Sequence, residues 1–164
     1  MRADNPLALE RIYDVFGSQL YGYQISLLCC KADAEDCFQN LFIRIAEKRR
    51  LLIGKEQLKA YLMTMARNEA LEFIRRRKKT TPTLVDQEAV LTTDETDHFL
   101  PVEELSSALA ALPLEQREVI SLKIYQELTF AEIGQRLGIS PNTAASRYRY
   151  GLKKMKELMQ EVIS

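Results

Sequence analysis

Residues 129–150 decide the fold, and they read TFAEIGQRLGISPNTAASRYRY. Thr129 is a good N-cap residue, and Glu132 three positions later completes a capping box at the start of a short helix. Gly138 stands where a turn needs a positive φ, and Ser140 is a good N-cap for a second helix. The stretch therefore predicts two short helices joined by a tight turn.

The second of these helices carries side chains of the types that hydrogen-bond base edges and phosphates in a DNA major groove. The candidate DNA-binding residues are Ser140, Asn142, Thr143, Ser146, Arg147, Arg149 and Lys153. Gly134 is a small residue where the two helices must cross closely, and Pro141 suits the first helical position. This pattern is typical of a helix-turn-helix unit, although a helical hairpin with a solvated charged face would share it. Many regulators contain such a unit, so it names no function by itself.

Outward from this unit, the preceding residues also follow a helical period. Residues 105–112 form one short apolar stripe, Pro113 interrupts it, and residues 119–128 form the next stripe. Residues 80–101 have no helical period and are rich in Thr and acidic side chains. Their composition predicts a linker.

The first half of the chain contains three more helical stripes. Apolar residues recur at intervals of three and four over 9–27, 37–45 and 58–73. Asp33 is the expected N-cap of the second helix, and the third helix is predicted over 56–77. Because no segment alternates with period two, the predicted fold is all-α, with two small helical domains and an acidic linker. The predicted boundaries are 1–79 for the first domain, 80–101 for the linker and 102–164 for the second domain.

Charge is segregated along the 164 residues, although Lys plus Arg and Asp plus Glu each number 23. Residues 1–80 carry 15 basic and 10 acidic side chains, and five of the bases are consecutive, from Arg75 to Lys79. Residues 81–104 carry seven acidic and no basic side chains, whereas residues 105–164 carry eight basic and six acidic ones. Two mildly basic domains therefore flank an acidic connector.

Composition places the protein among soluble globular chains, with 46% hydrophobic residues. No apolar run approaches the length of a membrane span, and the polar N-terminus has no secretory signal, so a cytoplasmic location is expected. The three cysteines, Cys29, Cys30 and Cys37, are an odd number and fall on or beside apolar stripes. They are predicted to be buried core thiols rather than disulfides or metal ligands.

Enzyme chemistry has little support in this sequence. There is one His, no glycine-rich phosphate loop, and no spacing typical of a catalytic triad or a metal site. We therefore expect no catalytic residues, no metal and no cofactor.

A second constellation carries a resemblance to a known family. Residues 33–42, DAEDCFQNLF, resemble the signature of sigma factor region 2, and residues 60–68 followed by Arg75-Arg76-Arg77 are similar to its continuation. The helix-turn-helix stretch resembles sigma region 4. Over about residues 7–79 and 102–160, the whole resembles a small two-domain sigma-70 factor of the extracytoplasmic-function type.

The resemblance implies a bacterial transcription initiation factor that binds core RNA polymerase and promoter DNA. Region 2 would dock on the clamp coiled coil of the β′ subunit, region 4 would meet the β flap, and an anti-sigma factor would be a further partner. The residues that match the polymerase-binding surface are Asp33, Glu35, Asp36, Gln39 and Phe42. Helix capping is the alternative explanation for acids at this position. The linker would thread through the polymerase, or serve only as a soluble spacer.

Region 2 would also open and hold the −10 element, which needs basic charge and a surface for an extruded base. The candidate residues are Lys59, Tyr61, Thr64, Arg67, Asn68, Arg75 and Arg76. Tyr61 stands where the family often has Trp, but its place on the apolar stripe favours a core role over stacking. The basic run would also fit a solvated helix end.

Two departures affect the −35 element. Ala145 and Tyr150 stand where many family members have basic residues, so recognition would rest more on Asn142, Ser146, Arg147 and Arg149. An alternative function is a sigma-like protein that sequesters an anti-sigma factor without initiating transcription. An ordinary helix-turn-helix repressor would leave the first 79 residues unexplained.

Overall fold

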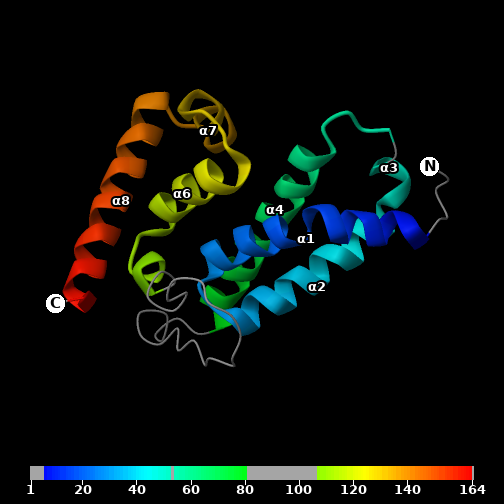
Figure 1. Ribbon diagram of the computed structural model, residues 1–164, viewed down its shortest axis with the longest axis horizontal. Coiled ribbons are helices and arrows are strands. Elements are labelled where there is room, and N and C mark those ends of the chain that lie inside the picture. The colour runs from blue at the N-terminus through cyan, green and yellow to red at the C-terminus, as the bar shows by residue number, and fades with distance from the viewer. Residues whose placement is uncertain (1–5, 53, 81–106, 164) are drawn as a thin grey trace. The chain divides into compact units, whose positions relative to one another are not determined.

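The computed structural model describes residues 6–52, 54–80 and 107–163. Every element in these ranges is an α-helix, so the expected all-α fold is confirmed for the described part of the chain (Figure 1). The described residues divide into two compact units, 6–25 with 32–80 and 26–31 with 107–163. Residues 81–101 of the predicted linker lie outside the described ranges. None of the described helices combines the length and apolarity that a membrane span requires.

The first unit contains most of three long helices and one short turn of helix. They are α1 (Pro6–Leu28), α2 (Lys31–Glu47), α3 (Arg49–Leu52) and α4 (Leu58–Thr80). The three long helices each bury the face that the apolar periodicity predicted. Fully buried side chains include Leu20 and Tyr23 of α1, Leu41 and Ile45 of α2, and Leu62 of α4.

Three local predictions in this unit need correction. Asp33 is not the N-cap of α2, because the helix begins at Lys31 and Asp33 lies within its first turn. The helix predicted over 56–77 is displaced by two to three residues and includes Thr80, which was assigned to the linker. Helix α3 was not predicted; it precedes a turn containing Gly54 at φ +78°.

The second unit consists of α6 (Leu114–Gln126), α7 (Phe130–Leu137) and α8 (Pro141–Ile163), and residues 107–110 are also helical. The capping box is confirmed: the Glu132 amide donates to Thr129 Oγ1 at 3.2 Å, and the Thr129 amide donates to the Glu132 carboxylate at 2.7 Å. These bonds satisfy two donors that the start of α7 would otherwise leave free.

The turn between α7 and α8 also forms as predicted. Gly138 adopts φ +68°, and the Thr143 amide donates to Ser140 Oγ at 3.1 Å, so Ser140 caps α8. A Cβ on Gly134 would lie 2.6 Å from the carbonyl oxygen of Ile139. The backbone of the turn, rather than a side chain of the second helix, therefore requires glycine. The second helix was expected to be short, but α8 has 23 residues.

Candidate nucleic-acid and protein interfaces

One face of α8 is an exposed polar stripe. Four of the predicted DNA-binding residues follow each other there at helical spacing, and we call Asn142, Ser146, Arg149 and Lys153 the recognition stripe. Asn142, Arg149 and Lys153 are exposed, and Arg149 Nη2 lies 3.5 Å from Ser146 Oγ. The stripe combines amide, hydroxyl and cationic donors, which suits contacts with base edges and phosphates.

The other three predicted residues of this helix have different surroundings. The hydroxyls of Ser140 and Thr143 lie 2.8 Å apart and belong to the helix cap. Arg147 faces α6, where its guanidinium lies 3.6 Å from the Glu115 carboxylate, and its side chain is only 29% exposed. The structure therefore separates Arg147 from the recognition stripe.

Phe130 of α7 contacts an aromatic side chain of α8 and a lysine of α6. The rings of Phe130 and Tyr148 lie 5.5 Å apart, and Lys123 Nζ lies 4.6 Å from the centre of the Phe130 ring. Lys123 also donates to the Leu128 carbonyl oxygen at 3.1 Å. A donor-bearing helix on such a support keeps its orientation when it enters a groove.

Tyr150 is an exposed aromatic residue of this unit for which no role was predicted. It is 66% exposed beside a surface depression at the start of α6. The depression is lined by Ala111, Pro113, Gln116, Tyr150, Lys153, Lys154 and Glu157. Two lysines therefore line it, and one of them, Lys153, belongs to the recognition stripe.

Part of α4 forms a second candidate nucleic-acid surface. Tyr61, Thr64 and Asn68 share one side of the helix, and Thr64 and Asn68 are exposed. Tyr61 is half-buried, with Lys55 Nζ 3.8 Å from its ring centre, so the prediction of a core position is wrong. Lys59, two residues before Tyr61, lies on another side of the helix and stands apart from this group.

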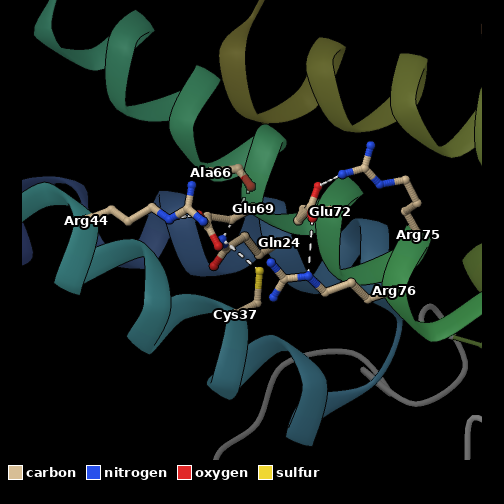
Figure 2. A network of polar contacts seen from close by, with 8 residues as sticks. All are labelled: Gln24, Cys37, Arg44, Ala66, Glu69, Glu72, Arg75 and Arg76. Carbon is tan, nitrogen blue, oxygen red and sulfur yellow. Dashed lines mark hydrogen bonds and ion pairs between the residues drawn. The ribbon is translucent and has the colours of Figure 1, made fainter. Parts of the chain in front are cut away.

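Carboxylates accompany the basic end of α4. Arg75 and Arg76 both pair with Glu72, the second at 3.2 Å, as Figure 2 shows. Arg77 pairs with Asp33 of α2 at 2.7 Å. The exposed pairs of Arg75 and Arg76 are weak and exchange readily for other partners, whereas the Arg77 pair is partly buried. The arginines can therefore reach phosphate only by leaving or sharing these carboxylates.

The outer face of α2 is polar and acidic, with one apolar exception. Glu35, Asp36 and Gln39 are exposed, whereas Phe42 is half-buried and lies 5.5 Å, ring centre to ring centre, from Tyr13. Ile43 is 57% exposed on the same face. Sequence patterning missed Ile43 because it reads as one more apolar residue beside the buried stripe.

A polar network joins the three long helices of the first unit (Figure 2). Gln24 of α1 donates to Cys37 Sγ at 3.2 Å and to the Ala66 carbonyl oxygen at 3.3 Å, and Arg44 pairs with Glu69 at 2.5 Å. Burial, reinforced by the charge of Glu69, raises the pKa of Cys37 to about 12.

The cysteines of the chain are free thiols. Cys29 and Cys37 are buried as predicted, and Cys30 is half-buried. In the described part of the chain, no three His, Cys, Asp or Glu side chains are grouped so that they could hold a metal ion.

Comparisons with known proteins decide the family. The model of sigma-70 region 2 matches residues 12–80, and the model of sigma-70 region 4 matches residues 102–155. The ECF RNA polymerase sigma factor SigL of Mycobacterium tuberculosis is 30% identical over 160 residues, which cover 94% of this chain and 90% of that protein. The chain belongs to the ECF sigma factors of the sigma-70 family.

Two further sigma factors are similar over most of their length. The RNA polymerase sigma factor SigZ of Bacillus subtilis is 27% identical, with 93% of this chain and 87% of that protein covered. The sigma factor RpoE in its co-crystal structure with the anti-sigma factor NepR from Bartonella quintana has a TM-score of 0.74 at 24% identity. That match covers 92% of this chain and 95% of the other, and it shows the likeness of the fold. In this ECF sigma factor, α1 to α4 fall largely within the region 2 match and α6 to α8 largely within the region 4 match.

Proposed function

We propose that this ECF sigma factor binds bacterial core RNA polymerase and directs promoter-specific initiation through the −10 and −35 elements. The observation that carries the proposal is the presence of both sigma regions in one chain, in order, each with its own exposed binding face. A repressor that used only the helix-turn-helix would not need the region 2 unit.

In this proposal the recognition stripe reads the −35 element. Asn142 and Ser146 supply hydrogen-bonding groups for base edges, and Arg149 and Lys153 supply charge for phosphates. Ser140 and Thr143 act mainly as the cap that starts the helix. Arg147 contributes from the flank of the helix, where Glu115 now holds it.

The −10 element would meet α4. Tyr61 offers a half-exposed ring for stacking, and Thr64 and Asn68 offer polar groups for a base edge. Arg67, Arg75 and Arg76 would attract the phosphates, with Lys59 reaching from another side of the helix. Because phosphate contacts release counterions, promoter binding should weaken steeply with added salt.

Core polymerase would dock on the acidic face of α2 through Glu35, Asp36 and Gln39, with Asp33 and Phe42 at its margin. The solved complex of RpoE with NepR supports the proposal of an anti-sigma partner as well. In this proposal the region 2 domain spans residues 1–79, and the region 4 domain begins at residue 102. The chain would act by binding rather than by catalysis, and it would do so in the cytoplasm together with core polymerase.

The decisive experiment is runoff transcription with bacterial core polymerase on a pool of genomic fragments, with and without this protein. We expect new promoter-specific transcripts, whose aligned starts would give the −10 and −35 elements. The Arg149→Ala variant should give fewer of these transcripts while it still binds core polymerase. Polymerase binding without any transcript, together with anti-sigma binding, would favour the decoy function instead. Equally tight promoter binding with and without polymerase would contradict the proposal.

A further inference from the structure

An exposed apolar residue lies in the middle of the acidic face of α2. Ile43 is 57% exposed, four positions after Gln39 and seven after Asp36, so the three residues share one side of the helix. Single apolar residues on a surface are common and need no explanation. Ile43 therefore indicates a binding surface only if neighbouring apolar side chains form a larger exposed patch with it.

Aromatic side chains provide that extension across to α1. Tyr13 is 56% exposed, and its ring centre lies 5.5 Å from that of Phe42 and 6.0 Å from that of Phe38. The Phe38 and Phe42 ring centres are 4.8 Å apart. A Cβ at Gly17 would lie 3.7 Å from the Tyr13 ring, at ordinary contact distance, so Gly17 packs beside this cluster. Tyr13 thus continues the α2 aromatic residues outward instead of closing the core.

The charge beside this patch favours one class of occupant. Glu35 and Asp36 are exposed on the same face of α2, and they would repel the phosphates of a nucleic acid. Apolar and aromatic anchors surrounded by polar residues are typical of protein interfaces. Gln39 lies one helical turn before Ile43, and Phe42 directly precedes it. The proposed function assigns both residues to core polymerase.

We propose that Tyr13 and Ile43, on either side of Phe42, form the apolar centre of the surface that docks core polymerase. This inference rests on the proposed function and widens its polymerase surface from α2 onto α1. The partner is an amphipathic helix or coiled coil that presents apolar side chains among basic ones. The apolar centre supplies most of the affinity, and Glu35 and Asp36 guide the approach.

The test measures the affinity of full-length variants for core polymerase by competition with a labelled wild-type protein. Ile43→Ser and Tyr13→Ser should each weaken binding about tenfold, as expected for anchors of an interface. Val15→Ser is the matched control, because Val15 is 63% exposed on α1 but lies two residues from Tyr13, on another side of the helix. Its affinity should equal that of the wild type.

Two further measurements identify the partner's chemistry. Ile43→Lys should weaken binding more than Ile43→Glu, because a basic partner repels the lysine. The loss in Ile43→Ser should persist at high salt, whereas the loss in Glu35→Gln should fade as salt screens it. Urea unfolding of each variant checks that the fold is kept. The Ile43 substitutions should disturb the fold least, because this side chain is more than half exposed.

The core-binding assay distinguishes a wrong assignment of the apolar centre from a wrong assignment of the sigma function. If wild-type protein binds core polymerase and the Ile43 and Tyr13 variants bind like Val15→Ser, the apolar centre is overturned and the sigma function stands. Unchanged core affinity with a loss only of anti-sigma binding would also overturn it, because the patch would then serve the other partner. If the wild type does not bind core polymerase at all, the proposed function fails and this inference fails with it.

Discussion

Asp33 and Arg77 form an ion pair of 2.7 Å that ties the first turn of α2 to the last turn of α4. The two side chains are 23% and 39% exposed, so the pair is partly shielded from water. Resemblance to the family assigns Asp33 to the polymerase surface, and the basic run that contains Arg77 is a candidate for phosphate contact. A single contact therefore links the two surfaces that region 2 would use.

The first prediction is that Asp33 contributes more to stability than to polymerase binding. Asp33→Asn should lower the free energy of unfolding by about 1 kcal/mol, the upper range for such pairs. Glu35→Gln removes an exposed charge for which residues 6–52, 54–80 and 107–163 provide no such partner, so it should leave stability unchanged and weaken polymerase binding more. Urea titration and core-binding assays on both variants check this. Strictly additive effects of Asp33→Asn and Arg77→Gln in a double-mutant cycle would show that the pair carries no coupling.

The structural features that depend on residues close together in the sequence were the most predictable. The capping box at Thr129, the left-handed Gly138 and the cap at Ser140 each involve residues within a few positions of one another, so the sequence contains the whole interaction. Helix periodicity likewise located the buried faces. These features fixed the helix-turn-helix almost residue by residue.

Features that depend on distant partners were not predictable. Asp33 read as an N-cap because nothing near it in the sequence reveals Arg77, which is 44 positions away. Arg147 belongs by type with Arg149, but Glu115 of another helix draws it to the flank. Ile43 could not be recognised as exposed until the structure showed which side of α2 its neighbours cover.

The second prediction contrasts two glycines of the same unit. A Cβ at Gly134 would lie 2.6 Å from a backbone oxygen, Ile139 O, whereas a Cβ at Gly151 would lie 2.6 Å from the flexible tip of Ile120. Gly134→Ala should therefore destabilise the protein by about 1–3 kcal/mol, since the turn must shift. Gly151→Ala should cost less, because Ile120 can rotate away and alanine favours the helix. Thermal unfolding of both variants measures the difference, and equal losses would contradict the role of the turn backbone.

The third prediction concerns the thiol of Cys37. Burial raises its pKa from the ordinary value of 9.0 to about 12, so the reactive thiolate is scarce at neutral pH. In the unfolded chain the thiol ionises near its ordinary pKa. The stabilising contribution of the neutral thiol is thus complete below about pH 8.5 and declines as pH rises toward the folded pKa. Iodoacetamide should modify half-buried Cys30 faster than Cys37 at pH 8, with the difference removed in urea. Equal rates in the native protein would contradict this.

The fourth prediction separates the two arginines of α8. Arg149 lies on the recognition stripe and is exposed, so Arg149→Ala should weaken holoenzyme binding to its promoter and reduce the salt slope by about one counterion. Arg147→Ala removes a side chain that is already paired with Glu115, so its effect on the salt slope should be smaller. Promoter binding measured over a range of salt concentrations gives both slopes.

Glu115 supplies the control for this comparison, because it holds Arg147 but lies on α6, outside the recognition helix. If Glu115 restrains Arg147 at the flank, Glu115→Gln should steepen the salt dependence, since the freed guanidinium becomes available to a phosphate. The same substitution in the Arg147→Ala background should then have little further effect. A salt slope that Arg147→Ala reduces as much as Arg149→Ala does would mean that the ion pair breaks on DNA and that both arginines meet the phosphates. If Glu115→Gln steepens the salt dependence equally in the Arg147→Ala background, the cause is the loss of an acidic charge near DNA and not the release of Arg147.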